Sequence, residues 1–66
     1  MPKVGEEYPT KIGPLIISSF MTSAFERETY GAKNRMYYVH LISNGYYFLG
    51  RFFRLKKARE FVLNHA

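Results

Sequence analysis

The Asn44-Gly45 pair constrains this chain more than any other feature, because it lies between two runs rich in aromatic and β-branched residues. Asn and Gly both accept the left-handed backbone conformations that the central positions of a tight hairpin turn require. The pattern therefore predicts two antiparallel strands, over residues 36–42 and 47–53, joined by a two-residue turn. In this geometry Ser43 opposes Tyr46, and that pair sets the register of the hairpin.

The predicted register divides the hairpin into two faces, because successive side chains of a strand point to opposite sides of the sheet. One face is almost wholly apolar and is predicted to be core; it carries Tyr37, Val39, Leu41, Phe48, Gly50 and Phe52. The other face is amphipathic; it carries Met36, Tyr38, His40, Ile42, Tyr47, Leu49, Arg51 and Phe53. A glycine within a strand often marks the close approach of another element, so we expect a helix to approach Gly50.

Two further elements complete the predicted secondary structure. Residues 15–21 form a short apolar run with β-branched side chains, which predicts a strand. Residues 55–65 show the 3.6-residue apolar period of a helix, whose small Ala58 allows close packing on the sheet. Between residues 22 and 35, Ser23 and Glu26 have capping-box spacing, so this segment either contains a helical turn or forms a mobile loop.

These elements predict an α+β fold, with a small three-stranded antiparallel sheet packed on one C-terminal helix in the order β-β-β-α. Residues 1–13 contain two prolines and two glycines and are predicted to form an irregular N-terminal arm, followed by a single domain over residues 14–66. At 66 residues and without cysteine, the chain has only a small core and no disulfides to stabilise it. The arm could fold over the amphipathic face, or a partner could cover it.

Charge indicates the class of partner. Ten Lys and Arg against five Asp and Glu give a formal net charge of +5, which favours an anionic ligand such as nucleic acid. No apolar run approaches the length of a membrane span, and the first residues are too polar for a secretory signal. We therefore expect a cytoplasmic protein with no membrane partner.

Catalytic and metal chemistry find little support in this composition. The only histidines are His40 and His65, there is no cysteine, and the five carboxylates are all glutamates, so no metal site or cofactor is expected. Glu26 and Glu28 are two residues apart, a spacing that does not put them on one helix face. There is no glycine-rich phosphate loop. The chain is therefore predicted not to be an enzyme.

The segment FLGRFFRLKKAREFV, residues 48–62, resembles the ethylene-response-factor type of DNA-binding domain, which also occurs in phage endonucleases and integrases. In that family the third strand reads Leu-Gly-x-Phe, and the helix that follows packs an alanine on the sheet. The matching residues here are Leu49, Gly50, Phe52 and Ala58, and the resemblance covers residues 36–63. It implies that the sheet enters the DNA major groove, with Arg51 in the base-contacting position. The family's Arg/Gly-rich first strand and its tryptophan are absent here.

The sequence thus predicts a small basic DNA-binding module of the phage or mobile-element type. The residues expected to contact the ligand are Tyr38, His40, Tyr47 and Arg51 on the sheet, with Arg54, Lys57, Lys33 and Arg35 on phosphates. The alternative is a non-enzymatic inhibitor or adaptor that binds an acidic host protein through the same aromatic face. A homodimer formed through that face is a third possibility.

Overall fold

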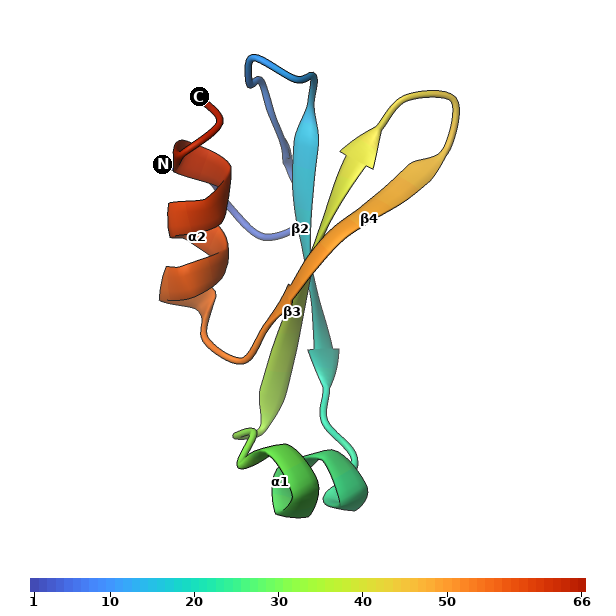
Figure 1. Ribbon diagram of the computed structural model, residues 1–66, viewed down its shortest axis with the longest axis vertical. Helices are drawn as coiled ribbons and strands as arrows, with labels where there is room; N and C mark the ends of the chain where they lie inside the picture. The colour runs from blue at the N-terminus through green and yellow to red at the C-terminus, as the bar shows by residue number, and fades with distance from the viewer.

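The computed structural model describes residues 1–66 and contains one four-stranded antiparallel sheet and two helices (Figure 1). In chain order the elements are β1 (Glu7–Tyr8), β2 (Leu15–Met21), α1 (Ala24–Tyr30), β3 (Arg35–Ile42), β4 (Tyr46–Phe52) and α2 (Leu55–Leu63). The strands lie in the sheet in the order β1-β2-β3-β4, so each is hydrogen-bonded to its neighbour in sequence. The α+β class was predicted, but a three-stranded sheet packed on one helix is wrong.

The additional strand, β1, comes from the predicted N-terminal arm. Glu7 lies opposite Ile16 and Tyr8 lies opposite Leu15, next to the first half of β2. A strand of two residues is too short to show an alternating pattern, and Pro9 directly after it argues against a strand. β1 therefore left no recognisable signal in the sequence.

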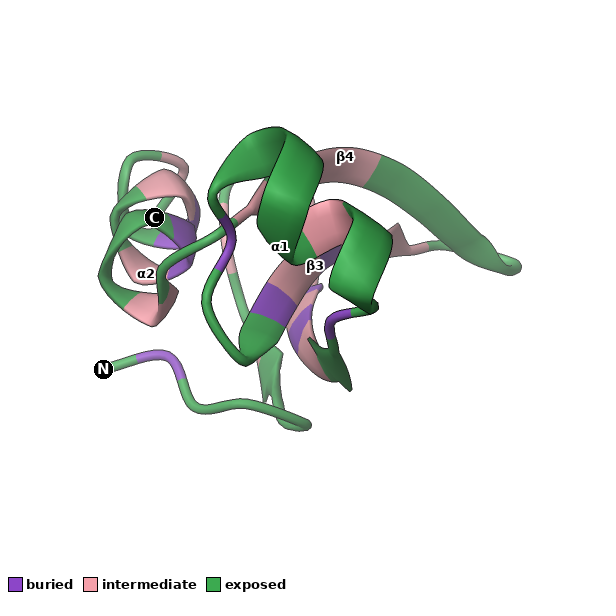
Figure 2. Cartoon of the chain, turned by 90° about the horizontal axis from the view of Figure 1, so that it is seen from below, coloured by how far each residue is buried: buried purple, intermediate pink, exposed green.

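The second helix, α1, occupies the segment that could have been a helical turn or a loop. The Ser23 side chain accepts a hydrogen bond from the Glu26 backbone N–H, and the Glu26 carboxylate accepts one from the Ser23 N–H. The helix ends at Gly31, whose φ of 66° lies in the left-handed region that favours glycine. No residue of α1 is buried (Figure 2), so the helix adds no side chain to the core and is closed by a cap at each end.

A side-chain network attaches α1 to the end of the sheet. The Arg27 guanidinium donates to the backbone carbonyl of Thr22 at 2.7 Å and to its hydroxyl oxygen at 3.2 Å. The Thr22 hydroxyl in turn donates to the carbonyl of Lys33 at 2.6 Å. Thr22 is buried, and these bonds join the two chain segments that flank α1.

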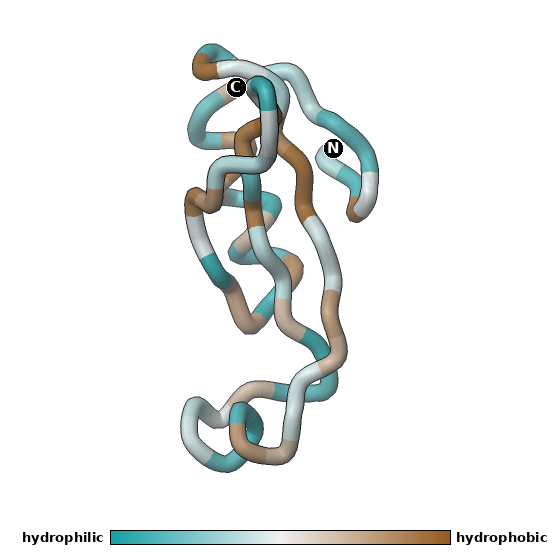
Figure 3. Tube along the Cα trace, turned by 90° about the vertical axis from the view of Figure 1, so that its right-hand side faces the viewer, coloured by the Kyte–Doolittle hydropathy of each residue, from teal (hydrophilic) through white to brown (hydrophobic).

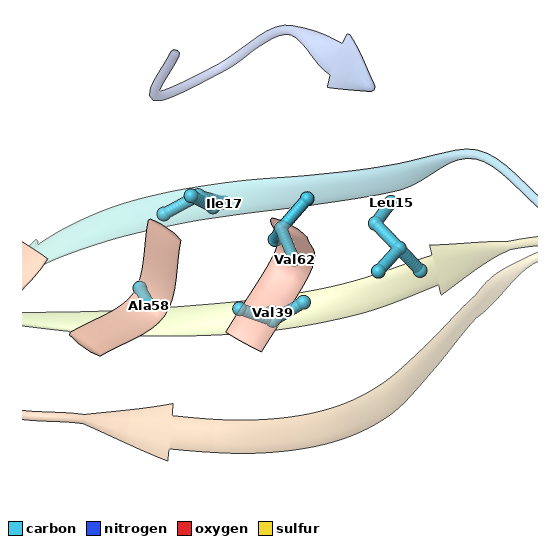
Figure 4. Packing of buried hydrophobic residues seen from close by; sticks show 5 residues of the cluster. All are labelled: Leu15, Ile17, Val39, Ala58 and Val62. Atoms are coloured by element: carbon cyan, nitrogen blue, oxygen red, sulfur yellow. The ribbon is translucent and has the colours of Figure 1, made fainter. Parts of the chain in front are cut away.

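The hydrophobic core lies between the sheet and α2. It consists of Leu15, Ile17, Val39, Ala58 and Val62, each no more than 1% exposed (Figure 4). The predicted packing of Ala58 on the sheet is confirmed. Figure 3 shows the hydrophobic start of β2 giving way to paler residues, and the burial of its side chains falls in the same direction. This cluster lies in the part of the sheet that α2 covers, and the only other buried hydrophobic side chains of the sheet and its loops are Met36 and Ala32, at the α1 end.

Gly50 has a different steric role from the one predicted. A Cβ atom at this position would lie 3.0 Å from the Phe52 ring, and no atom of α2 is among its near contacts. The ring of Phe52 lies 5.4 Å from that of Phe61 on α2, centroid to centroid. Gly50 thus makes room for a side chain of its own strand, which then packs on the helix.

The N-terminal arm lies along the edge of β2 and against α2. The Gly5 N–H donates to the carbonyl of Ile17, and Pro2 is buried, with its carbonyl accepting from the Arg59 side chain at 3.0 Å. Both chain ends consequently lie beside α2 (Figure 1). The arm and α2 leave the opposite face of the sheet open. Only the α1 end of that face is covered, where Met36 is buried and the Tyr30 ring of α1 lies over Arg51. Neither helix has the length and apolar character of a membrane span.

The close contact at Ala58 predicts the effect of enlarging that side chain. Ala58→Leu would force extra atoms between α2 and the sheet, and we expect it to lower the free energy of unfolding by about 1–3 kcal/mol. Urea denaturation followed by circular dichroism measures this loss. The control is Lys56→Leu, which adds the same side chain at an exposed helix position. Equal stabilities of the two variants would contradict the packing described.

Candidate functional site: an open aromatic sheet face

The register of the β3–β4 hairpin changes part-way along its length. Tyr38 opposes Arg51 and Val39 opposes Gly50, as predicted, but His40 opposes Phe48. Leu49 is therefore an extra residue in β4, which is the definition of a β-bulge.

The hairpin loop explains why the bulge exists. Ile42 pairs with Tyr46, so the loop has three residues rather than the predicted two. Asn44 and Gly45 still adopt the positive φ values expected of them, 54° and 139°. The longer loop shifts the register by one residue, and the bulge at Leu49 shifts it back.

A register shift of one residue exchanges the two faces of a strand. Between the loop and the bulge, the predicted facing of β4 is therefore wrong. Tyr47 opposes Leu41 and lies on the core side, although it is 55% exposed because the core does not extend to the hairpin tip. Leu49 packs against the core, whereas Phe48 lies on the uncovered side.

The sheet surface opposite α2 is called the outer face below. It carries Ile16, Ser18 and Phe20 from β2, Met36, Tyr38, His40 and Ile42 from β3, and Tyr46, Phe48 and Arg51 from β4. Of these, only Met36, at the α1 end, is buried. No pocket is present, so this face is an open surface. Two predicted contact residues on β3 and one on β4 lie here together: Tyr38, His40 and Arg51.

Five rings of the outer face form a continuous group, which we call the aromatic stripe: Phe20, Tyr38, His40, Phe48 and Tyr46. The ring centroids of Phe20 and Tyr38 are 5.1 Å apart, and those of Tyr38 and Phe48 are 6.0 Å apart. His40 lies 5.8 Å from Phe48 and 6.0 Å from Tyr46. The stripe therefore crosses three strands diagonally, from the α1 end of β2 to the hairpin tip.

His40 lies in the middle of the stripe with an unpaired polar atom. Its Nδ1 atom is buried and has no hydrogen-bond partner. The surrounding rings of Tyr38, Phe48 and Tyr46 supply packing contacts but no acceptor or donor for this nitrogen. A buried polar atom without a partner destabilises the fold by about 1–3 kcal/mol.

Arg51 is the only arginine or lysine on the outer face. Its guanidinium carbon lies 5.3 Å from the centroid of the Tyr30 ring, in a cation–π arrangement. The Tyr30 ring also stacks on Phe53 with a centroid distance of 6.1 Å. Arg51 consequently lies between the aromatic stripe and a second group of rings contributed by α1 and the end of β4.

The other basic residues predicted to contact the ligand are dispersed. Arg35 opens β3 on the same side as Val39, the side that faces α2. Arg54 precedes α2 without capping it, and Lys57 on that helix lies 3.6 Å from Glu60. Lys33 lies in the exposed loop after α1. These four cations do not join Arg51 in one patch.

Sequence reasoning missed three members of the stripe: Phe20, Tyr46 and Phe48. Phe20 was assigned to an apolar strand without a facing. The other two were misplaced or ignored because an Asn-Gly pair suits both two-residue and three-residue loops. The residues that could have indicated the shift are the three consecutive aromatics, Tyr46 to Phe48, since alternation alone cannot bury all of them.

Comparison with known proteins adds no relative to this picture. No family model, curated protein or solved structure matches the chain. No three His, Cys, Asp or Glu side chains are grouped so that they could hold a metal ion. The candidate site is therefore described from its own geometry alone.

Replacing His40 with phenylalanine tests the unpaired nitrogen. His40→Phe keeps an aromatic ring in the stripe and removes the buried polar atom, so we expect the free energy of unfolding to rise by up to about 1 kcal/mol. Urea denaturation measures the change, with Tyr46→Phe as a control that removes only an exposed hydroxyl group. A loss of more than about 1 kcal/mol in His40→Phe would show that the nitrogen has a stabilising partner.

Proposed function

We propose that this protein is a small, non-enzymatic nucleic-acid-binding module, with DNA as its ligand, that binds through the outer face of its sheet. The observation that supports this most is the aromatic stripe, an exposed run of rings on a face that the rest of the chain leaves uncovered. The chain carries a net charge of +5, and none of its acidic residues lies in β2, β3 or β4. Rings stack on bases and sugars, and a positive protein attracts the phosphate backbone.

The positions of the basic residues indicate two roles for them, one in direct contact with DNA and one at longer range. Arg51, beside Tyr38, is positioned to pair with a phosphate or a guanine edge next to the stacked rings. The dispersed cations Lys33, Arg35, Arg54 and Lys57 raise the positive potential around the molecule and increase its encounter rate with DNA. For a module of the phage or mobile-element type, we propose the cytoplasm of the host cell as the compartment in which it binds DNA.

A second candidate function is binding to another protein, or to a second copy of this chain, through the same face. It is favoured by the presence of only one Arg or Lys on the outer face, where the Tyr30 ring already contacts it. Exposed aromatic surface of this kind on a small domain is typical of an interaction site. The surface of the partner that contacts this face would be largely apolar. Because the protein carries a net charge of +5, the partner as a whole would be acidic.

Two adjacent tyrosine and phenylalanine residues provide a matched test. Phe48→Ala removes a ring of the stripe that is 60% exposed, whereas Tyr47→Ala removes a ring of similar exposure, 55%, from the opposite face. If DNA binds the outer face, Phe48→Ala weakens binding by about 1–3 kcal/mol and Tyr47→Ala has little effect. Fluorescence anisotropy with a labelled oligonucleotide measures both affinities, and circular dichroism confirms that both variants are folded.

The same two variants separate the candidate functions. Sedimentation of the wild-type protein over a range of concentrations detects a dimer, and Phe48→Ala would weaken that dimer if it uses the outer face. Absence of DNA binding together with a concentration-dependent mass would favour the protein-binding function. A larger loss of DNA affinity in Tyr47→Ala than in Phe48→Ala would contradict the outer face as the DNA site.

A further inference from the structure

We infer that the ligand of the outer face is single-stranded DNA, whose unpaired bases stack along the aromatic stripe. This inference rests on the proposed DNA-binding function and names the form of DNA. The family resemblance implies a duplex in which the sheet enters the major groove. The charges and exposed rings of the outer face are better suited to unpaired bases.

The distribution of basic residues is the first reason to infer single-stranded rather than duplex DNA. A protein that binds a duplex neutralises several phosphates with Lys and Arg, and it reads base edges with hydrogen-bonding side chains. The only Lys or Arg residues in the three long strands are Arg35 and Arg51, and Arg35 lies on the side of α2. One guanidinium group is too little to hold a duplex on this face.

The exposure of the rings is the second reason. Phe20, Phe48 and Tyr46 are 49%, 60% and 66% exposed, so each presents ring surface to solvent. Between them lie Tyr38 and His40, which are only partly exposed and contact the rings of Phe20 and Tyr46. In a duplex the ring faces of the bases are stacked on each other and inaccessible, whereas unpaired bases can stack on aromatic side chains.

The residues beside the stripe favour DNA over RNA. Ile16 opposes His40 on β2, and Ile42 opposes Tyr46 at the hairpin tip, so apolar side chains flank the rings. A ribose 2′-hydroxyl placed on these side chains would lose its water without gaining a hydrogen bond, at a cost of about 1–3 kcal/mol. Deoxyribose has no such group and packs on apolar side chains without that cost.

The two ends of the stripe define the path of a bound DNA strand across the sheet. Phe20 marks the end near α1 and Tyr46 marks the end at the hairpin tip, and the three rings between them come from β3 and β4. A strand that follows it would pass Arg51, which opposes Tyr38, and could place one phosphate there. Most of the binding energy would come from stacking, so binding should depend only weakly on salt.

Affinity measurements with three matched oligonucleotides test this inference. The probes are oligo-dT of about 12 nucleotides, the duplex of that strand with oligo-dA, and oligo-rU of the same length, within the range of known single-strand sites. We expect the single DNA strand to bind at least about tenfold more tightly than the duplex or the RNA, a difference of about 1.4 kcal/mol. We also expect the logarithm of affinity to fall with the logarithm of salt concentration with a slope of about −0.7, which corresponds to one neutralised phosphate.

Three variants, one of them a control, test whether the stripe binds the strand. Phe20→Ala removes the ring at the α1 end and should weaken single-strand binding by about 1–3 kcal/mol. The control is Phe25→Ala, which removes an exposed ring from α1 outside the stripe. Arg51→Ala should weaken binding and make the salt slope shallower by about 0.7.

The outcomes distinguish this inference from the proposed function. Duplex bound as tightly as the single strand would overturn the inference while leaving DNA binding in place. Equal affinity for the RNA strand would overturn the choice of DNA. No binding of any probe would overturn the proposed function as well, and loss of binding in Phe25→Ala but not Phe20→Ala would overturn the assignment to the stripe.

Discussion

The β-bulge at Leu49 determines which side chains this protein presents to its surroundings. Without it, a hairpin closed by a three-residue loop would carry its shifted register along the whole of β4, and Arg51 and Phe52 would exchange faces. With it, Phe52 packs on α2 and Leu49 turns toward the core, while Phe48 and Tyr46 remain on the outer face. The bulge thus joins the hairpin tip, which is paired in one register, to the rest of the hairpin, which is paired in another.

The restricted core explains why so much aromatic surface stays exposed. Only nine of the 66 residues are buried, and a nine-residue helix covers one side of a sheet whose strands extend past it at both ends. The N-terminal arm packs beside α2 and on the β2 edge, and α1 is held by hydrogen bonds at the far end of the sheet. A chain of this length has no further element with which to cover the outer face, so the stripe persists as an exposed surface.

Most of the long elements could be predicted from the sequence, because each has a period or a cap that local chemistry requires. The apolar period predicted α2, and the aromatic and β-branched runs on either side of Asn44-Gly45 predicted β3 and β4. The Ser23–Glu26 spacing left open a helical turn, which is α1, or a loop. β1 could not be predicted, since two residues carry no period. The facing of β4 near the loop could not be predicted either, because loop length and bulge position depend on whether Leu49 or Phe48 packs better against the core. The site predicted from the sequence therefore combined residues of both faces of the sheet. Tyr38, His40 and Arg51 lie on the outer face, whereas Tyr47 lies on the opposite one.

Measuring the register of the hairpin at His40 tests most directly whether the aromatic stripe exists. Nuclear Overhauser contacts between the ring protons of His40 and Phe48, whose centroids are 5.8 Å apart, measure it in solution. We expect these contacts, together with contacts of Leu49 to side chains of the core cluster. Direct pairing of His40 with Leu49, and of Leu41 with Phe48, would show a two-residue turn without a bulge. That result would place Phe48 in the core and remove the aromatic stripe on which the proposed function depends.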